Sequence, residues 1–392
     1  MKNKPLFSIP FYKHISILSF IILIGHFSLV FFEINISLFL DFFLIGLLLF
    51  NFKLDKTDYR LYLISILIIL LILLRFLYSS ASWDTTYFFI SLKLLIFFVL
   101  FISIKPVIAI NKIRLINNIK HLFILSCILI FSDKIYAIFT QGLLNGLNFR
   151  PRLIGEINFD IVLLIEMWLL LKLYDPNYKK YLGYLLFIIV IISLSRSGII
   201  GYVLTFFFFN QIKNKSFNLI IFLKNLSLVF IGLSLVLLIY YIRDPKLDFA
   251  NIDRIQLLNA LVNSYGDNAF LKLLIGNGLL MPLPSSICLP FSMYAKATTG
   301  DAGNCNPVIL FSFFLRCTYE YGIIIMFLIP YFYYKLLSKT VNKLKAISIL
   351  MPVIAISLAV GGFYNSIAIL SLLIAKYTAT LFDEKSQINN NL

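Results

Sequence analysis

Runs of apolar residues recur through almost the whole of this chain of 392 residues. A helix that spans a bilayer needs about 20 mostly apolar residues, and many of these runs approach or reach that length. Only 13% of the residues are charged and 60% are hydrophobic, whereas soluble domains carry about 25% charged residues. The sequence therefore predicts an all-α polytopic membrane protein that lies in a lipid bilayer.

We expect about twelve transmembrane helices, the shorter of them extended by flanking polar residues. The apolar segments are His14–Phe32, Ile34–Leu49, Leu61–Leu77, Tyr87–Ile104, Leu122–Thr140, Ile157–Leu173, Tyr181–Leu194, Gly198–Phe209, Ile220–Ile242, Pro307–Tyr334, Ile347–Val360 and Phe363–Leu381. They divide the chain into helices one to nine (1–242, with a short loop at 141–156), one large loop (243–304), and helices ten to twelve with a tail (305–392).

The positions of the basic residues predict the orientation in the membrane. If the N-terminus is inside, every inside segment carries lysine or arginine, as the positive-inside rule requires. The loops 141–156 and 243–304 are then external, and both termini are cytoplasmic. The basic N-terminus precedes an apolar run without a small-residue cleavage site, which indicates an uncleaved first helix. The net charge of +16 is therefore a topology signal and not evidence for nucleic-acid binding.

The arginines are segregated from the lysines. Seven of the nine arginines fall in or near the predicted outer half: Arg75, Arg150, Arg152, Arg196, Arg243, Arg254 and Arg316. Either cation would satisfy the topology, so the segregation needs another cause, and the guanidinium fork binds phosphate in a bidentate manner. We expect some of these arginines to bind an anionic headgroup. The alternative is that they pair with acids that hold the loops in place, namely Glu156, Asp244, Asp253 and Glu320.

Two short external segments carry such arginines. In RPRLIGEINFD, Arg150 and Arg152 flank a proline and precede Glu156 and Asn158, an arrangement that suits an anionic headgroup. The alternative is a helix N-cap by Asn158. In SLSRSG, Arg196 is enclosed by apolar runs, and an ionisable residue inside a membrane is a functional candidate by default. An internal salt bridge of Arg196 is the alternative.

The large loop contains an amphipathic helix and a glycine motif. The helix presents Asp253 and Arg254 at its start, and LIGNG follows it. Gly276 and Gly278, on either side of Asn277, allow a turn at which a sugar or phosphate could approach backbone N–H groups. In the same loop, Cys288 and Cys305 could form a disulfide on an oxidising side of the membrane.

After the loop, Arg316 and Glu320 lie four residues apart on one helix face. They could form an ion pair, or Glu320 could be a desolvated general base beside a phosphate-binding arginine. Further acids in apolar segments could pair with lysines or polar neighbours, or serve a proton- or ion-coupled transporter: Asp41, Asp160 and Glu166, with Lys93 and Lys134 as candidate partners. The large loop contains no histidine, and the chain has no motif typical of a metal site.

From Arg150 to Phe327 the order of motifs resembles the O-antigen polymerase and ligase superfamily. The features are RLIGEINFD before a helix, SLSRSG at an external helix junction, an arginine-led outer loop that reaches LIGNG, and YEYGIIIMF. Ligases of this superfamily carry a histidine in the large loop, so the chain is more similar to Wzy-type O-antigen polymerases. It departs from the paired R-x10-G pattern of those polymerases, because the spacing from Arg254 to Gly266 is one residue longer.

The resemblance implies a GT-C-like fold and a metal-independent glycosyltransferase without a cofactor, in the bacterial inner membrane. The enzyme would join undecaprenyl-diphosphate-linked oligosaccharide repeat units on the periplasmic face, with a chain-length regulator as a candidate partner. Arginines in a common pocket would bind the diphosphates, namely Arg152, Arg196, Arg254 and Arg316. Glu320, or else Glu156 or Asp253, would orient or deprotonate the acceptor hydroxyl. A ligase and a lipid-linked oligosaccharide flippase remain the alternatives.

Overall fold

The computed structural model describes residues 11–32, 40–46, 85–103, 111–154, 157–213, 253–266, 269–278, 281–284, 307–310 and 312–389, with scattered helical residues at 63, at 70 and within 223–237. All regular elements in these ranges are helices, and the ranges contain no strand. The expectation of an all-α chain is confirmed for this part of the molecule.

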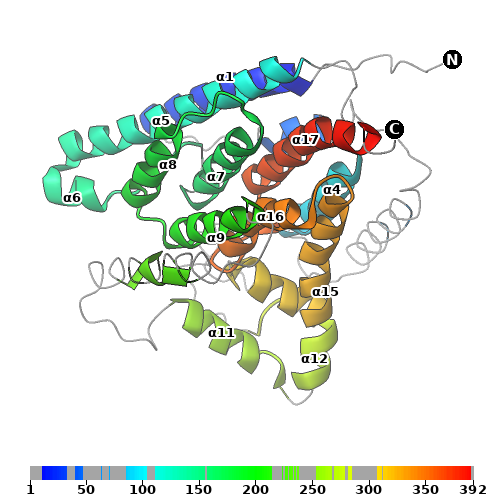
Figure 1. Cartoon of the computed structure of the whole chain (residues 1–392). Coiled ribbons are helices and arrows are strands. Elements are labelled where there is room, and N and C mark those ends of the chain that lie inside the picture. The colour runs from blue at the N-terminus through cyan, green and yellow to red at the C-terminus, as the bar shows by residue number, and fades with distance from the viewer. Residues whose placement is uncertain are drawn as a thin grey trace.

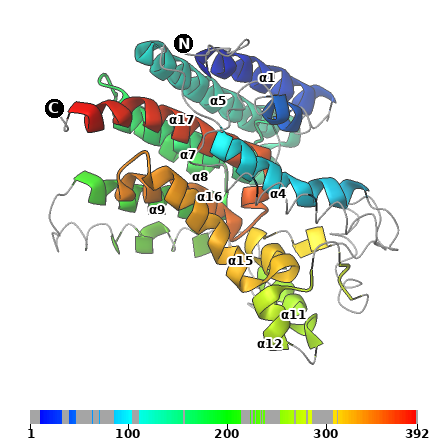
Figure 2. The same cartoon turned by 90° about the vertical axis from the view of Figure 1, so that its right-hand side faces the viewer.

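The bundle has three layers of paired helices, with further helices around them (Figures 1 and 2). The outer pair is α1 (Phe11–Phe32) and α5 (Lys112–Gln141), the central pair α7 (Ile157–Tyr174) and α17 (Ser366–Asn389), and the other outer pair α9 (Arg196–Lys213) and α16 (Lys343–Ser357). The surrounding helices are α4 (Thr85–Ser103), α6 (Leu143–Asn148), α8 (Tyr181–Ile192) and α15 (Phe313–Ser338). The central pair is therefore covered from both sides.

Burial follows this layering. Every residue of 158–171 in α7 and of 366–380 in α17 is buried, as expected for helices that are apolar on all faces. The outer helices instead expose large apolar side chains, such as Phe20 on α1 (63% exposed) and Phe139 on α5 (83% exposed). Apolar side chains on the outside and polar ones inside are typical of a bundle that is surrounded by lipid.

Four described helices are long and apolar enough to cross a membrane: Ile15–Phe32, Lys112–Gln141, Phe313–Ser338 and Ser366–Asp383. Nine of the twelve expected segments coincide with α1, α4, α5, α7, α8, α9, α15, α16 and α17. The other three lie wholly or partly outside the described residues. The described chain therefore has the features of a helical membrane protein, while the number of twelve spans remains a prediction.

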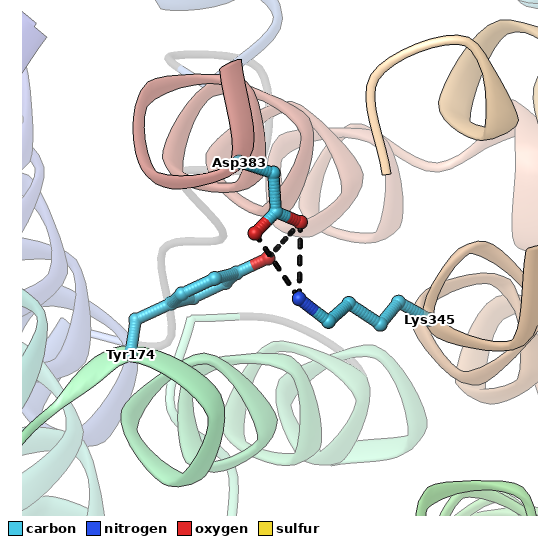
Figure 3. A network of polar contacts seen from close by, with 3 residues as sticks. All are labelled: Tyr174, Lys345 and Asp383. Carbon is cyan, nitrogen blue, oxygen red and sulfur yellow. Dashed lines mark hydrogen bonds and ion pairs between the residues drawn. The ribbon is translucent and has the colours of Figure 1, made fainter. Parts of the chain in front are cut away.

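The two ends of the bundle differ in their charged residues. We call the end at which α1 begins and α17 ends the lysine end, after Lys112, Lys172 and Lys345. There Tyr174 of α7 donates a hydrogen bond to Asp383 of α17 (3.1 Å), and Lys345 of α16 pairs with the same carboxylate (3.1 Å; Figure 3). This cluster joins three helices of two layers. The opposite end carries the arginines Arg150, Arg152, Arg196 and Arg316, and we call it the arginine end.

A small separate core lies beside the first half of α15. Two helices of the large loop, α11 (Asp253–Asn263) and α12 (Ala269–Ile275), lie below the bundle next to that half (Figure 2). Leu257 and Leu261 of α11, and Tyr265 just after it, are buried and pack with Tyr319 of α15. Burial raises the pKa of Tyr265 to about 12, so its phenol is neutral at physiological pH. The described part of the loop is therefore a packed cap on α15.

Candidate functional site at the arginine end

The loop that carries Arg150 and Arg152 is held by polar side chains from three helices. His26 of α1 donates through Nδ1 to the carbonyls of Arg152 (3.1 Å) and Leu153 (3.3 Å). Asp133 of α5 accepts the backbone N–H of Arg152 (2.7 Å), and Asp160 of α7 accepts that of Leu153 (2.8 Å). Because buried backbone groups need partners, these side chains fix the path of the loop where α7 begins.

A further contact fixes the start of this loop, where Lys134 of α5 donates to the carbonyl of Phe149 (2.6 Å). Lys134 and Asp160 had been expected to pair with each other or with polar neighbours, and the described bonds of both go to the loop backbone. The other expected pairing is confirmed, because Lys93 of α4 lies 2.5 Å from the carboxylate of Asp41. Several charges of the apolar segments therefore have a structural role.

A cavity of about 370 Å³ lies beside Arg152 and is lined also by Asp133, Phe149 and residues of α1 and α5. Arg152 is exposed and Arg150 half-buried, on either side of the buried Pro151. The cavity has a size suited to a small polar group, since ligand pockets measure roughly 300–1,000 Å³. Among the predicted arginines whose side chains the structure describes, Arg152 lines this cavity.

The serine-rich junction between α8 and α9 is joined to the start of α7. The side-chain oxygen of Asn158 accepts hydrogen bonds from Ser195 (2.7 Å) and Ser197 (3.2 Å), which flank Arg196. Asn158 lies inside α7, so the alternative that it caps this helix is wrong. Leu194, with φ of 52°, turns the chain into α9. Arg196 is thus held half-buried in the first turn of α9, close to the arginine-bearing loop in the fold.

Arg316 and Glu320 of α15 form the ion pair that the spacing allows. Nε of Arg316 lies 3.0 Å from Oε1 of Glu320, and the two residues are 4% and 1% exposed. Tyr364, between α16 and α17, donates to Oε2 of Glu320 (2.8 Å), and its ring lies 4.2 Å from the Arg316 guanidinium. Both carboxylate oxygens therefore accept a hydrogen bond, and the ion-pair alternative is the arrangement present.

The LIGNG segment docks directly on this part of α15. The N–H of Asn277 donates to the carbonyl of Tyr319 (2.7 Å) and that of Gly278 to the carbonyl of Glu320 (3.1 Å). At Gly322 the helix is broken, with φ of 84° and ψ of 167°. A Cβ on Gly322 would lie 2.0 Å from the carbonyl oxygen of Leu274, so only glycine allows this approach.

This docking corrects one expectation from the sequence. The backbone N–H groups of Gly276, Asn277 and Gly278 donate to carbonyls of Lys272, Tyr319 and Glu320, so a sugar or phosphate does not meet free N–H groups there. The glycines serve contact between two backbones instead. The side chain of Asn277 is different, because its Nδ2 is buried and has no hydrogen-bond partner among the described residues. Glycan binding by that side chain remains a prediction.

Several predicted residues lie beyond what the structure describes. Glu156, Cys288 and Cys305 are outside the described residues, and for Asp253 and Arg254 only the helical backbone of α11 is described. A common cavity for Arg152, Arg196, Arg254 and Arg316 therefore remains a prediction. The described residues contain no group of three or more His, Cys, Asp or Glu side chains placed to hold a metal ion.

Sequence reasoning missed His26, Asp133 and Tyr364 as parts of this end of the molecule. His26 and Asp133 gave a usable signal, because a polar residue in an apolar helix needs a partner in the bundle. Tyr364 gave no such signal, since it contacts a residue 44 positions away.

Searches against protein-family models, curated proteins and solved structures found no match for this chain.

Proposed function

We propose that the chain is a polymerase that joins undecaprenyl-diphosphate-linked oligosaccharide repeat units into a polysaccharide on the periplasmic face of the bacterial inner membrane. One observation carries the proposal: LIGNG and YEYG, two motifs of the resemblance separated by about 40 residues, lie against each other beside the Arg316–Glu320 pair. The arginine-bearing loop at the same end of the bundle supports the same function.

In the proposed reaction the acceptor hydroxyl oxygen attacks the anomeric carbon of the donor sugar. The bond from that carbon to the diphosphate oxygen breaks, and its electron pair leaves with undecaprenyl diphosphate. Guanidinium groups stabilise the charge that develops on this leaving group. We assign this role to Arg152 beside the 370 Å³ cavity, with Arg150, Arg196, Arg254 and Arg316 as further candidates.

In this proposal Glu320 positions neighbouring side chains and is not the general base. Both of its oxygens accept hydrogen bonds, from Arg316 and Tyr364, so it is suited to orienting these two side chains. The proton of the acceptor hydroxyl would then pass to another carboxylate of the external side, and Glu156 and Asp253 are the sequence candidates. The arginines would take the electrostatic role that a metal ion has in other glycosyltransferases.

The substitution Arg196→Lys tests the diphosphate-binding role. Lysine keeps the charge but not the planar fork, so we expect elongation to fall by about 10²-fold, the scale of one lost transition-state donor, while the protein still inserts. The measurement is the length of glycan made from lipid-linked repeat units by purified protein without any ion gradient. Arg114→Lys, at the lysine end, is the matched control and should elongate normally. Normal ladders from Arg196→Lys would remove Arg196 from the site.

Glu166 provides the test against a transporter. It is 1% exposed in the centre of α7, and neither of its carboxylate oxygens has a hydrogen-bond partner among the described residues. A buried carboxyl of this kind is what a proton-coupled flippase would use. The substitution Glu166→Gln keeps the shape and removes the exchangeable charge, so a polymerase should keep its elongation rate within about twofold.

If the wild-type protein elongates no glycan and Glu166→Gln loses translocation of the lipid-linked glycan, the protein is a flippase and not a polymerase. A ligase is separated by a deletion strain: loss of a polymerase leaves single repeat units on the lipopolysaccharide core, whereas loss of a ligase leaves none. The in vitro elongation assay and the strain therefore decide between the three functions.

A further inference from the structure

A groove of about 780 Å³ runs from the lysine end between α7, α8 and α9, and Ile231 and Gly232 also line it. Its wall includes Trp168 and Lys172 of α7, Gly183 and Phe187 of α8, and Tyr202 of α9. This volume lies in the range of roughly 300–1,000 Å³ that ligand pockets have. The lysine-bearing part of the groove is at the opposite end of α7 from Asn158, and the groove runs from there along α8 to Ile191 and Ile199, next to the serine-rich junction.

The groove is apolar along α8 and opens on an apolar surface. Gly183, Phe187 and Ile191 line it at four-residue spacing, which places them on one face of α8 over about 12 Å at roughly 1.5 Å per residue. Among the lining residues, Tyr184 is 68% exposed and Ile231 is 55% exposed. A water-soluble ligand does not suit an opening of this kind, whereas a hydrocarbon chain that lies in a bilayer does.

The described charged residues that line the groove are both lysines. Lys172 and Lys180 line it, and no acidic residue is among its described lining residues. The ammonium group of Lys172 lies 4.2 Å from the ring of Phe209, 4.6 Å from that of Trp168 and 4.8 Å from that of Phe206. Such rings hold a cation in place by cation–π attraction. The positive charge therefore stands at the end of α7, beside the apolar wall.

We infer that this groove binds one anionic phospholipid, with an acyl chain along the Gly183–Ile191 face of α8 and the phosphate at Lys172 and Lys180. The length of the apolar face selects a chain-bearing ligand, and the two lysines, with no described acid in the lining, select an anionic headgroup over a zwitterionic one. A basic side chain near a membrane surface strengthens the binding of anionic lipids by roughly fivefold. The inference does not depend on the proposed function, because neither lysine is among the residues assigned to the reaction.

The test is lipid binding to purified full-length protein in detergent, measured by native mass spectrometry with phosphatidylglycerol and with phosphatidylcholine of the same acyl chains. We expect phosphatidylglycerol to bind more tightly to the wild-type protein. The double variant Lys172→Gln with Lys180→Gln should lower its affinity roughly thirtyfold, toward that of phosphatidylcholine. The matched control removes two exposed lysines at the same end but outside the groove, Lys339→Gln with Lys343→Gln, and should bind as the wild type does.

A second variant keeps both charges. Ile191→Trp fills the groove far from the lysines and should weaken the binding of both lipids. If the double lysine variant does not fold, Ile191→Trp and the single variant Lys180→Gln, each measured separately, decide the question. Equal affinity for the two lipids in the wild type would overturn the inference, as would an equal loss in the control pair. Displacement of phosphatidylglycerol by an equal concentration of glycerol 3-phosphate would also overturn it, because the apolar wall would then contribute nothing.

Discussion

Replacing Gly322 with alanine should detach the LIGNG segment from α15 and reduce glycan elongation by about 10²-fold or more, since misplacement of a catalytic group by about 1 Å has that effect. The added Cβ would lie 2.0 Å from the carbonyl oxygen of Leu274 and 2.7 Å from the carbonyl carbon of Ile275. Both are backbone atoms, so no side-chain rotation relieves the contact. The loop must therefore move away from Glu320 and its neighbours.

Two glycines serve as controls for Gly322→Ala. A Cβ on Gly201 would make only ordinary contacts, the nearest at 3.6 Å from the Cβ of Ala355, so Gly201→Ala tests the addition of a methyl group in the bundle. Gly142 has a φ of 80° with no atom within 4 Å of an added Cβ, so Gly142→Ala tests backbone strain alone.

The structural readout of this experiment is limited proteolysis of the segment around α11 and α12. We expect faster cleavage in Gly322→Ala than in either control. An unchanged cleavage pattern would show that the docking is not as described. Faster cleavage with normal elongation would support the docking seen in the wild-type structure but contradict its link to the proposed function.

Replacing Arg316 with alanine should cost about 3–5 kcal/mol of stability, because removal of one partner leaves the buried charge of Glu320 unpaired. The comparison is Lys345→Ala, which breaks the partly exposed pair with Asp383 in Figure 3 (24% and 19% exposed side chains) and should cost no more than about 1 kcal/mol. The measurement is the thermal stability of the two variants in the same detergent. Equal losses would contradict the burial of the Arg316–Glu320 pair.

A double variant separates the structural role of Arg316 from its proposed role in the reaction. Arg316→Met with Glu320→Gln removes both charges, and an amide oxygen remains to accept the hydrogen bond from Tyr364. Replacement of both members of a buried pair is often neutral, so this variant should recover most of the lost stability. We expect it to elongate no glycan. A stable and active double variant would remove Arg316 from diphosphate binding.

The sequence predicted the positions of nine described helices because each contains a continuous apolar run, although the runs in α8, α9 and α16 are shorter than a helix that spans a bilayer. It also predicted that Arg316 and Glu320 share a helix face, since residues four apart are neighbours on a helix. Spacing alone did not decide between ion pair and general base, because the deciding contact is with Tyr364, from a different part of the chain.

The glycine motif shows a different limit of the sequence. Gly276 and Gly278 indicated backbone freedom and a close approach, and both are present with positive φ. The pattern did not indicate which group makes the approach, and the structure has Glu320 and Gly322 of α15 there instead of a ligand. Likewise, Lys134 and Asp160 were recognised as polar residues that need partners, but the bond that each makes to the backbone of a loop is one that no side-chain pattern reveals.

The break at Gly322 has a consequence for how the large loop can vary. The loop supplies N–H donors to the carbonyls of Tyr319 and Glu320, so part of the hydrogen bonding of α15 comes from outside the helix. A spanning helix tolerates little unsatisfied backbone. Insertions or deletions should therefore be accepted more readily in parts of the loop other than α11, α12 and the LIGNG segment, while loss of Asn277 and Gly278 would leave α15 itself incomplete. A change in the LIGNG segment would therefore need a matching change in the first half of α15.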